Sequence, residues 1–113
     1  MAELSIHAVD VTRAVPAAGM RVVVSRAVPS GETIFDGALG PQGATAPAID
    51  GLEPGPYEVA FHVAAWYRGQ GVALADPPFL DVAPFRFAIA DADAHYHLPF
   101  KFTAWGFSLF RGS

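Results

Sequence analysis

Glycine and proline divide this chain into short apolar segments. Its 113 residues include 11 Gly and 10 Pro, and the runs between them alternate or stay apolar over only a few positions. Such spacing is typical of an all-β sandwich or barrel, because a helix needs a longer uninterrupted segment. A chain of this length supports one hydrophobic core, so we expect a single domain over residues 1–113.

Strand candidates follow one another closely, and we expect about seven or eight of them. The first, Leu4–Val9, alternates so that Ser5, His7 and Val9 share one face, opposite Leu4, Ile6 and Ala8. The other candidates are Met20–Val28, Thr33–Asp36, a brief strand at Thr45–Pro47, Tyr57–Trp66, Phe85–Ile89, Tyr96–Ala104 and Gly106–Phe110.

The connections between these strands carry turn-forming residues. Pro16–Gly19 is predicted to be a turn, and residues 37–55 a long irregular connection rich in Gly and Pro. Tyr67–Ala75 is predicted to form one or two helical turns. Pro99 is predicted to mark a sheet edge or a bulge, because proline has no N–H to donate to a β-ladder.

The balance of apolar and charged residues excludes a disordered chain. Apolar side chains make up 52% of the sequence and charged ones 16%, whereas disorder requires the opposite balance. The apolar surplus suggests a subunit interface or an apolar pocket. Trp105, Phe107 and Phe110 place large rings on both faces of the last predicted strand, which favours an interface over an ordinary core strand.

Charge and cysteine content exclude several classes of function. The net charge is −4 without any Lys/Arg cluster, which argues against nucleic-acid and anionic-membrane partners. The absence of Cys excludes disulfides, thiol catalysis and thiolate zinc sites. No apolar stretch approaches the roughly 20 residues of a membrane helix, and no secretory leader is recognisable, so we expect a soluble, cytoplasmic protein.

Four histidines are the main candidates for chemistry: His7, His62, His95 and His97. Histidine is a ready general acid or base near neutral pH. His95 and His97 lie two residues apart and therefore share a strand face. Such a pair also occurs in metal sites, but no third ligand is evident, so no metal is predicted. A surface or structural role is the alternative for any one of these histidines.

Three separated segments of the sequence resemble the 5-hydroxyisourate hydrolase branch of the transthyretin family. They are LSIHAVD at residues 4–10 with Pro16-Ala17 after it, HYHLP at residues 95–99, and the C-terminal WGFSLFRGS at residues 105–113. The resemblance spans the whole chain in the right order. It implies a transthyretin-like eight-stranded β-sandwich with one short helix. It also implies a homotetramer, a dimer of dimers whose central channel holds paired active sites.

The resemblance also implies a reaction and a set of site residues. His7 and His97 correspond to catalytic histidines, and Arg111 and Ser113 belong to a tail that enters the same pocket. His95 is expected to be a hydrogen-bonding neighbour at the substrate. The implied reaction is hydrolysis of a cyclic amide in an oxidised purine, with water as the nucleophile and with no cofactor.

Two positions depart from the family pattern. Ala44 stands where the family usually has a substrate-contacting arginine, and Phe110 where it has a tyrosine. An altered substrate is our main hypothesis: an N-methylated 5-hydroxyisourate, in its boldest form the trimethyl compound from caffeine C8 oxidation, because each buried methyl group contributes about 0.8 kcal/mol. The alternatives are the ordinary 5-hydroxyisourate hydrolase of urate degradation and a non-catalytic small-molecule binder. Arg68 or Arg111 could also replace the lost arginine.

Overall fold

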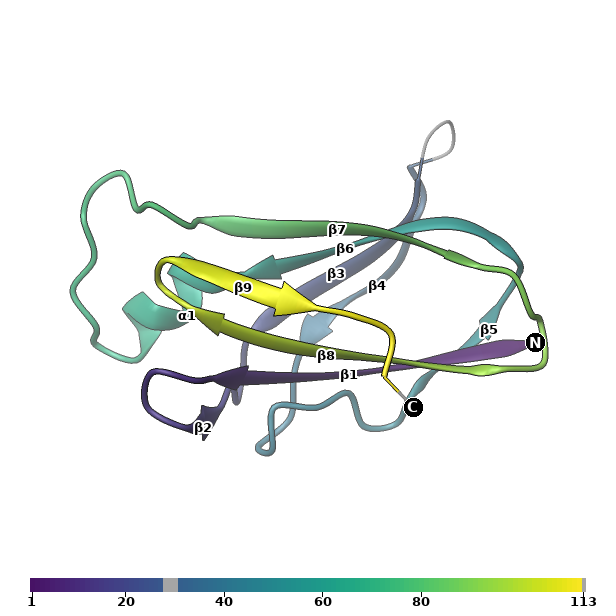
Figure 1. Ribbon diagram of the computed structural model, residues 1–113, viewed down its shortest axis with the longest axis horizontal. Coiled ribbons are helices and arrows are strands. Elements are labelled where there is room, and N and C mark those ends of the chain that lie inside the picture. The colour runs from purple at the N-terminus through teal and green to yellow at the C-terminus, as the bar shows by residue number, and fades with distance from the viewer. Residues whose placement is uncertain (28–30, 113) are drawn as a thin grey trace.

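Two β-sheets packed face to face form the protein, as the sequence predicts (Figure 1). The computed structural model describes residues 1–27 and 31–112. One sheet has the order β2-β1-β8-β9, with β5 also paired to β1, and the other has the order β4-β3-β6-β7. The elements are β1 (Ala2–Asp10), β2 (Val15–Pro16), β3 (Arg21–Arg26), β4 (Thr33–Ala38), β5 (Ile49–Leu52), β6 (Gly55–His62), α1 (Val63–Gly69), β7 (Val82–Ile89), β8 (His95–Thr103) and β9 (Gly106–Leu109).

The core fills the space between the two sheets. Strand β1 alternates as predicted: Leu4, Ile6 and Ala8 are fully buried, and the residues between them are half-buried on the outer face. The rings of Phe61 on β6 and Phe100 on β8 stack across the sandwich, with their centroids 3.8 Å apart. Because the inner face holds the two sheets together, the outer face of β1 is available for other chemistry.

The helix begins earlier in the chain than predicted. The predicted strand Tyr57–Trp66 ends at His62, and α1 occupies Val63–Gly69 instead of starting at Tyr67. The backbone N–H groups of Val63 and Ala64 both donate to the carbonyl of Asp81, which turns the chain out of the sheet. Alternation in this segment was misleading, because its apolar positions also fit the buried side of a short helix.

The connection between β4 and β6 also differs from the prediction. Thr45–Pro47 is not a strand; an isolated bridge between His7 and Ala44 holds this segment against β1. The strand of this connection is β5, four residues long and paired antiparallel with β1. Together with the two-residue β2, it raises the number of strands among the described residues to nine. The predicted turn at Pro16–Gly19 starts later, since Pro16 belongs to β2.

The prediction for Pro99 is wrong, because β8 is an inner strand without a bulge at this position. It pairs in parallel with β1, and His7 lies opposite Pro99. On its other side β8 pairs with β9 from Phe100 onward, and the bridge between His97 and Gly112 continues the same register. The missing N–H of Pro99 therefore falls in a gap between two paired stretches, where it disrupts little.

Several large rings remain exposed at one end of the sandwich. Trp105 and Phe79 are 72% and 76% exposed, and their ring centroids lie 5.9 Å apart. Phe107 and Phe110 of the C-terminal segment are also exposed. Trp105, Phe107 and Phe110 lie on or beside the last strand, where a subunit interface is predicted. The interface itself stays a prediction. No helix within residues 1–27 and 31–112 is long and apolar enough to cross a membrane.

Candidate active site

Three of the four histidines converge on the outer face of the β1–β8 pair. In the parallel register, Glu3 lies opposite His95 and Ser5 lies opposite His97. His7 follows Ser5 by two residues on β1 and therefore lies on the same face. Residues two apart on a strand share a face, so all five side chains project to the same side. The pairing of β1 with β8 therefore brings the predicted catalytic pair, His7 and His97, onto one face. His62 lies on β6 in the opposite sheet and takes no part in this cluster.

Hydrogen bonds link four of these side chains in a continuous chain. Oε1 of Glu3 lies 2.7 Å from Nδ1 of His95, and Nε2 of His95 lies 2.9 Å from Oγ of Ser5. The same hydroxyl lies 2.7 Å from Nδ1 of His97. One serine therefore connects the two histidines of β8. Glu3 and Ser5 were missed as site residues in the sequence, although their alternation with His7 was the signal that could have found them.

His7 is held from the other side by the connection between β4 and β5. Its Nε2 lies 3.1 Å from the backbone carbonyl of Gln42. This contact has no signal in the sequence, because a backbone carbonyl can belong to any residue. The bridge between His7 and Ala44 places the Ala44 methyl group on the histidine face, since bridged antiparallel residues project to the same side.

The surroundings of His97 favour its neutral form. Burial lowers the pKa of His97, and the nearby His7 and His95 lower it further when they carry charge. A histidine that stays neutral near pH 7 keeps one ring nitrogen free to accept a proton. This is the state required of a general base.

The C-terminal tail runs beside His97, alongside β8 (Figure 1). The N–H of Gly112 donates to the carbonyl of His97 at 2.7 Å. A Cβ atom at Gly112 would lie 2.9 Å from Cδ2 of that imidazole, so only glycine fits at this approach. The shared register places Phe110 opposite Pro99, on the histidine face. Ser113 lies outside the described residues.

The structure does not bring Arg68 or Arg111 to the histidines. The guanidinium of Arg111 lies over the ring of Tyr96, 4.0 Å from its centroid, and donates to the carbonyl of His95. Arg68 lies on α1 and donates to the carbonyl of Ala75. Of the seven Lys and Arg residues, all within the described part of the chain, Lys101 is the one on the outer face of β8, 5.9 Å from the Phe110 ring.

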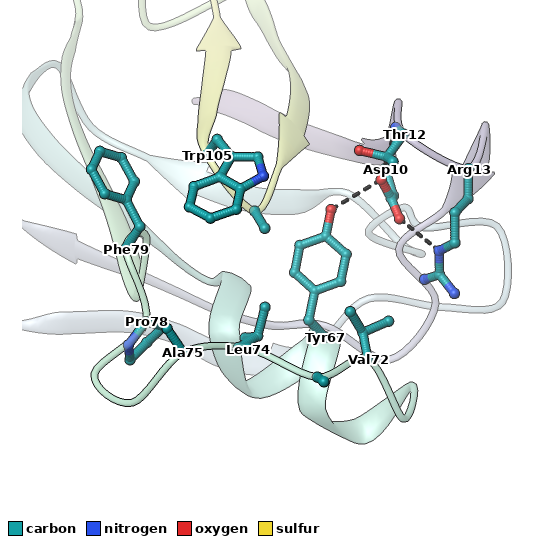
Figure 2. Close-up of a pocket in the computed structure, with 12 residues that line it drawn as sticks. Asp10, Thr12, Arg13, Tyr67, Val72, Leu74, Ala75, Pro78, Phe79 and Trp105 are labelled. Carbon is teal, nitrogen blue, oxygen red and sulfur yellow. Dashed lines mark hydrogen bonds and ion pairs between the residues drawn. The ribbon is translucent and has the colours of Figure 1, made fainter.

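A separate cavity lies at the α1 end of the sandwich (Figure 2). Its volume is about 280 Å³, and Trp105 and Phe79 form part of its apolar wall. None of the four histidines, all of which are described, lines this cavity. We therefore take the β1–β8 face, and not the cavity, as the candidate active site.

The buried carboxylate of Asp10 lies at the border of this cavity. Burial alone would raise its pKa, but hydrogen bonds from Arg13, Tyr67 and the backbone of Thr12 outweigh burial and leave the pKa below its usual range. Burial and the bond to Asp10 raise the pKa of Tyr67 to about 12. The group is a structural network with its bonds satisfied, not a reactive site.

Within residues 1–27 and 31–112, no group of three or more His, Asp or Glu side chains is arranged to hold a metal ion. The donors on the histidine face are instead linked to one another by hydrogen bonds.

A two-sheet sandwich with paired histidines on the outer face of one sheet defines a transthyretin-like protein equipped for acid–base chemistry. The chain belongs to the HIUase/Transthyretin family, whose model matches residues 4–112.

Several proteins similar to this chain are named as 5-hydroxyisourate hydrolases, and the match covers nearly their whole length. The 5-hydroxyisourate hydrolase of Deinococcus radiodurans is 43% identical over 114 residues, covering 97% of this chain and 95% of its own. The structure of Klebsiella pneumoniae 5-hydroxyisourate hydrolase superposes on this chain with a TM-score of 0.84 at 30% identity. The match covers 100% of each chain. The structure of an (S)-allantoin synthase superposes with a TM-score of 0.86 at 28% identity. This match covers 99% of the present chain but only 44% of the synthase chain.

These similarities confirm three expectations from the sequence: the family, the transthyretin-like all-β fold and the assignment to the hydrolases.

Proposed function

We propose that the protein hydrolyses the cyclic amide of 5-hydroxyisourate, without a cofactor. The observation that carries the proposal is the placement of His7 and His97 on one outer sheet face, close enough for the charge of one to lower the pKa of the other. The relatives named as 5-hydroxyisourate hydrolases support this substrate, which was the alternative in the sequence analysis, over its methylated form.

The proposed reaction is an acid–base catalysed addition of water. One histidine accepts a proton from water, and the hydroxyl oxygen bonds to the amide carbon. The C–N bond of the ring then breaks. The leaving nitrogen takes up a proton from the histidine pair, which acts as the acid once it has accepted the proton of the water. Proton transfer of this kind contributes about a hundred- to ten-thousandfold in rate.

We assign the substrate contacts to the residues around this pair. Ala44 beside His7 and Phe110 opposite Pro99 supply apolar contacts from two sides. His95 contributes through its bond to Ser5. The proposed binding set also includes Arg111 and Ser113 of the tail, which meets His97 at Gly112. Contact of Arg111 with substrate requires its guanidinium to leave the ring of Tyr96.

A methylated 5-hydroxyisourate is the second candidate substrate, and one observation favours it. Both departures from the family pattern, Ala44 and Phe110, lie on the histidine face, where they offer carbon in place of hydrogen-bonding groups. The ratio of kcat/KM for trimethylated and unmethylated substrate decides between the two. A ratio well below one excludes the methylated substrate.

The site is proposed to work in a homotetramer. Exposed Trp105, Phe107 and Phe110 lie on or beside β9, the edge strand of the sheet that carries the histidines. Association through this strand would bury those rings and place the histidine faces of different subunits near one another.

The test of the proposed function is the decay of freshly prepared 5-hydroxyisourate, followed by ultraviolet absorbance with and without purified protein. Catalysed decay, absent for the His7→Ala and His97→Ala proteins, supports the proposal. Unchanged decay with 5-hydroxyisourate and with its methylated forms would instead indicate a non-catalytic binder.

A further inference from the structure

We propose that Glu3, His95 and Ser5 act as positioning residues that hold His97 in its Nδ1–H tautomer, which leaves Nε2 of His97 as the atom that accepts the proton of the attacking water. The inference deepens the proposed function and rests on it for the role of the water. The arrangement of the hydrogen bonds does not depend on the reaction.

The direction of each hydrogen bond follows from the groups that make it. An ionised carboxylate only accepts, so Nδ1 of His95 donates to Glu3. Nε2 of a neutral His95 is then an acceptor and takes the hydroxyl proton of Ser5. A serine has one proton to donate, so its oxygen must accept from Nδ1–H of His97. Which ring nitrogen carries the proton is set by the bond that the other nitrogen makes.

The remaining nitrogen of His97 is thereby defined. Its Nε2 carries a lone pair and forms no hydrogen bond within the described residues. His7 differs in this respect, because its Nε2 donates to the Gln42 carbonyl and is already engaged. We therefore assign different roles to the two histidines: Nε2 of His97 accepts the proton of the water, and His7, whose Nε2–H is held by the Gln42 carbonyl, serves the substrate.

The same chain predicts what happens when His95 gains a proton. A charged His95 donates from Nε2 to Ser5, so the hydroxyl must turn and donate to Nδ1 of His97. His97 would then carry its proton on Nε2 and could not act as the base. The titratable and charged groups on this face or beside it are Glu3 and His7 on β1, His95 and Lys101 on β8, and Arg111 on the tail.

The burial of His97 supports the proposal independently. Burial is the main cause that lowers the pKa of His97, so the ring is neutral at pH 7 and carries its single proton on one of its two nitrogens. A neutral ring without the Ser5 bond would distribute its proton between both nitrogens.

Three variants test the chain. Ser5→Ala breaks it between the two histidines, Ser5→Thr keeps the hydroxyl, and Ser25→Ala is the matched control on β3 of the other sheet. We expect Ser5→Ala to lower kcat by about tenfold or more with little change in KM, by analogy with metal-bound histidines, for which loss of the orienting partner costs about ten- to a hundredfold. Ser5→Thr should restore most of kcat, and Ser25→Ala should leave it unchanged.

Nitrogen-15 NMR of the histidine rings gives the second readout, because it distinguishes a protonated from an unprotonated ring nitrogen. At pH 7.5 the unsubstituted protein should show His97 protonated on Nδ1 and bare on Nε2, and Ser5→Ala should show a mixture of tautomers.

The outcomes separate this inference from the proposed function. An Nε2–H tautomer in the unsubstituted protein, or a Ser5→Ala protein with both kcat and tautomer unchanged, would overturn the positioning chain. A protein with the expected tautomer but without hydrolysis of 5-hydroxyisourate would overturn the proposed function and leave the chain supported.

Discussion

The Ser5 hydroxyl lies 2.7 Å from Nδ1 of His97, although 92 residues separate them in the sequence. They meet because β1 and β8 pair in parallel, with Ser5 directly opposite His97. The site is therefore a property of the pairing of these two strands, and substitutions on their outer face should alter catalysis more than stability.

Removal of either paired histidine is expected to abolish most of the activity. His7→Ala and His97→Ala should each lower kcat/KM by about a hundred- to ten-thousandfold, because each removes one half of the proposed acid–base pair. Both side chains lie on the outer face, so the assembly should persist. His62→Ala, on the opposite sheet, is the control and should change kcat/KM less than twofold. A comparable loss in the control would contradict the assignment.

The charge state of His97 should depend on His7. The lowered pKa of His97 comes from burial and from the charges of His7 and His95. In the His7→Gln protein the pKa of His97, measured from the NMR titration of its ring proton, should therefore rise toward the ordinary value of about 6.5. An unchanged titration would show that His7 exerts no influence on it.

The stability of the fold should fall in mild acid for the same reason. Since the folded pKa of His97 lies below the unfolded value, the unfolded chain binds more protons between the two values. The free energy of unfolding, measured by urea titration, should decrease as the pH falls from about 6.5 through the folded pKa. His97→Gln should reduce this decrease.

Lys101 is expected to assist substrate binding. It is the cation on the histidine face, where the family resemblance leads us to expect an arginine at the position of Ala44. Lys101→Met keeps the length of the side chain and removes its charge, and KM should rise about threefold to tenfold, as for an exposed charge contact of about 1 kcal/mol. Arg86→Met on β7 is the control. An unchanged KM would exclude Lys101 as a substitute for the arginine.

Tyr67 should contribute to stability through its bond to the buried Asp10 carboxylate. The hydroxyl donates at 3.0 Å, and Tyr67→Phe should lower the free energy of unfolding by about 1.5–3 kcal/mol, the range for hydrogen bonds to charged groups. Tyr57→Phe removes a bond to the neutral Glu53 carbonyl and a longer one, 3.4 Å, from the Arg26 guanidinium, and should cost only about 0.5–1.5 kcal/mol. Denaturant titration of both proteins compares the two values, and equal losses would show that the charge of Asp10 adds nothing.

Exposed Trp105 should hold subunits together. Trp105→Ser removes a ring that is 72% exposed, and light scattering coupled to size exclusion should show a shift from the proposed tetramer toward smaller species. Val82→Ser, on β7 of the other sheet, is the control and should leave the mass unchanged. A Trp105→Ser protein of unchanged mass would place the interface elsewhere.

Sequence patterns predicted the elements whose side chains alternate cleanly. The outward position of His7 followed from the apolar residues on either side of it. That His95 and His97 share one face of β8 followed from their spacing of two residues. The start of α1 at Val63 was not predictable in this way, because helix and strand both bury apolar residues in so short a segment. The Gln42 carbonyl and the position of Arg111 over Tyr96 depend on how distant segments meet.

The parallel pairing of β1 with β8 also bears on how this protein folds. A contact between positions near 5 and near 97 requires closure of most of the chain, and contacts of such long range slow folding. The histidine pair cannot form in a partly synthesised or partly folded chain that lacks β8. The return of hydrolysis after dilution from denaturant should therefore coincide with completion of the whole sheet, which makes catalysis a late reporter of the native state.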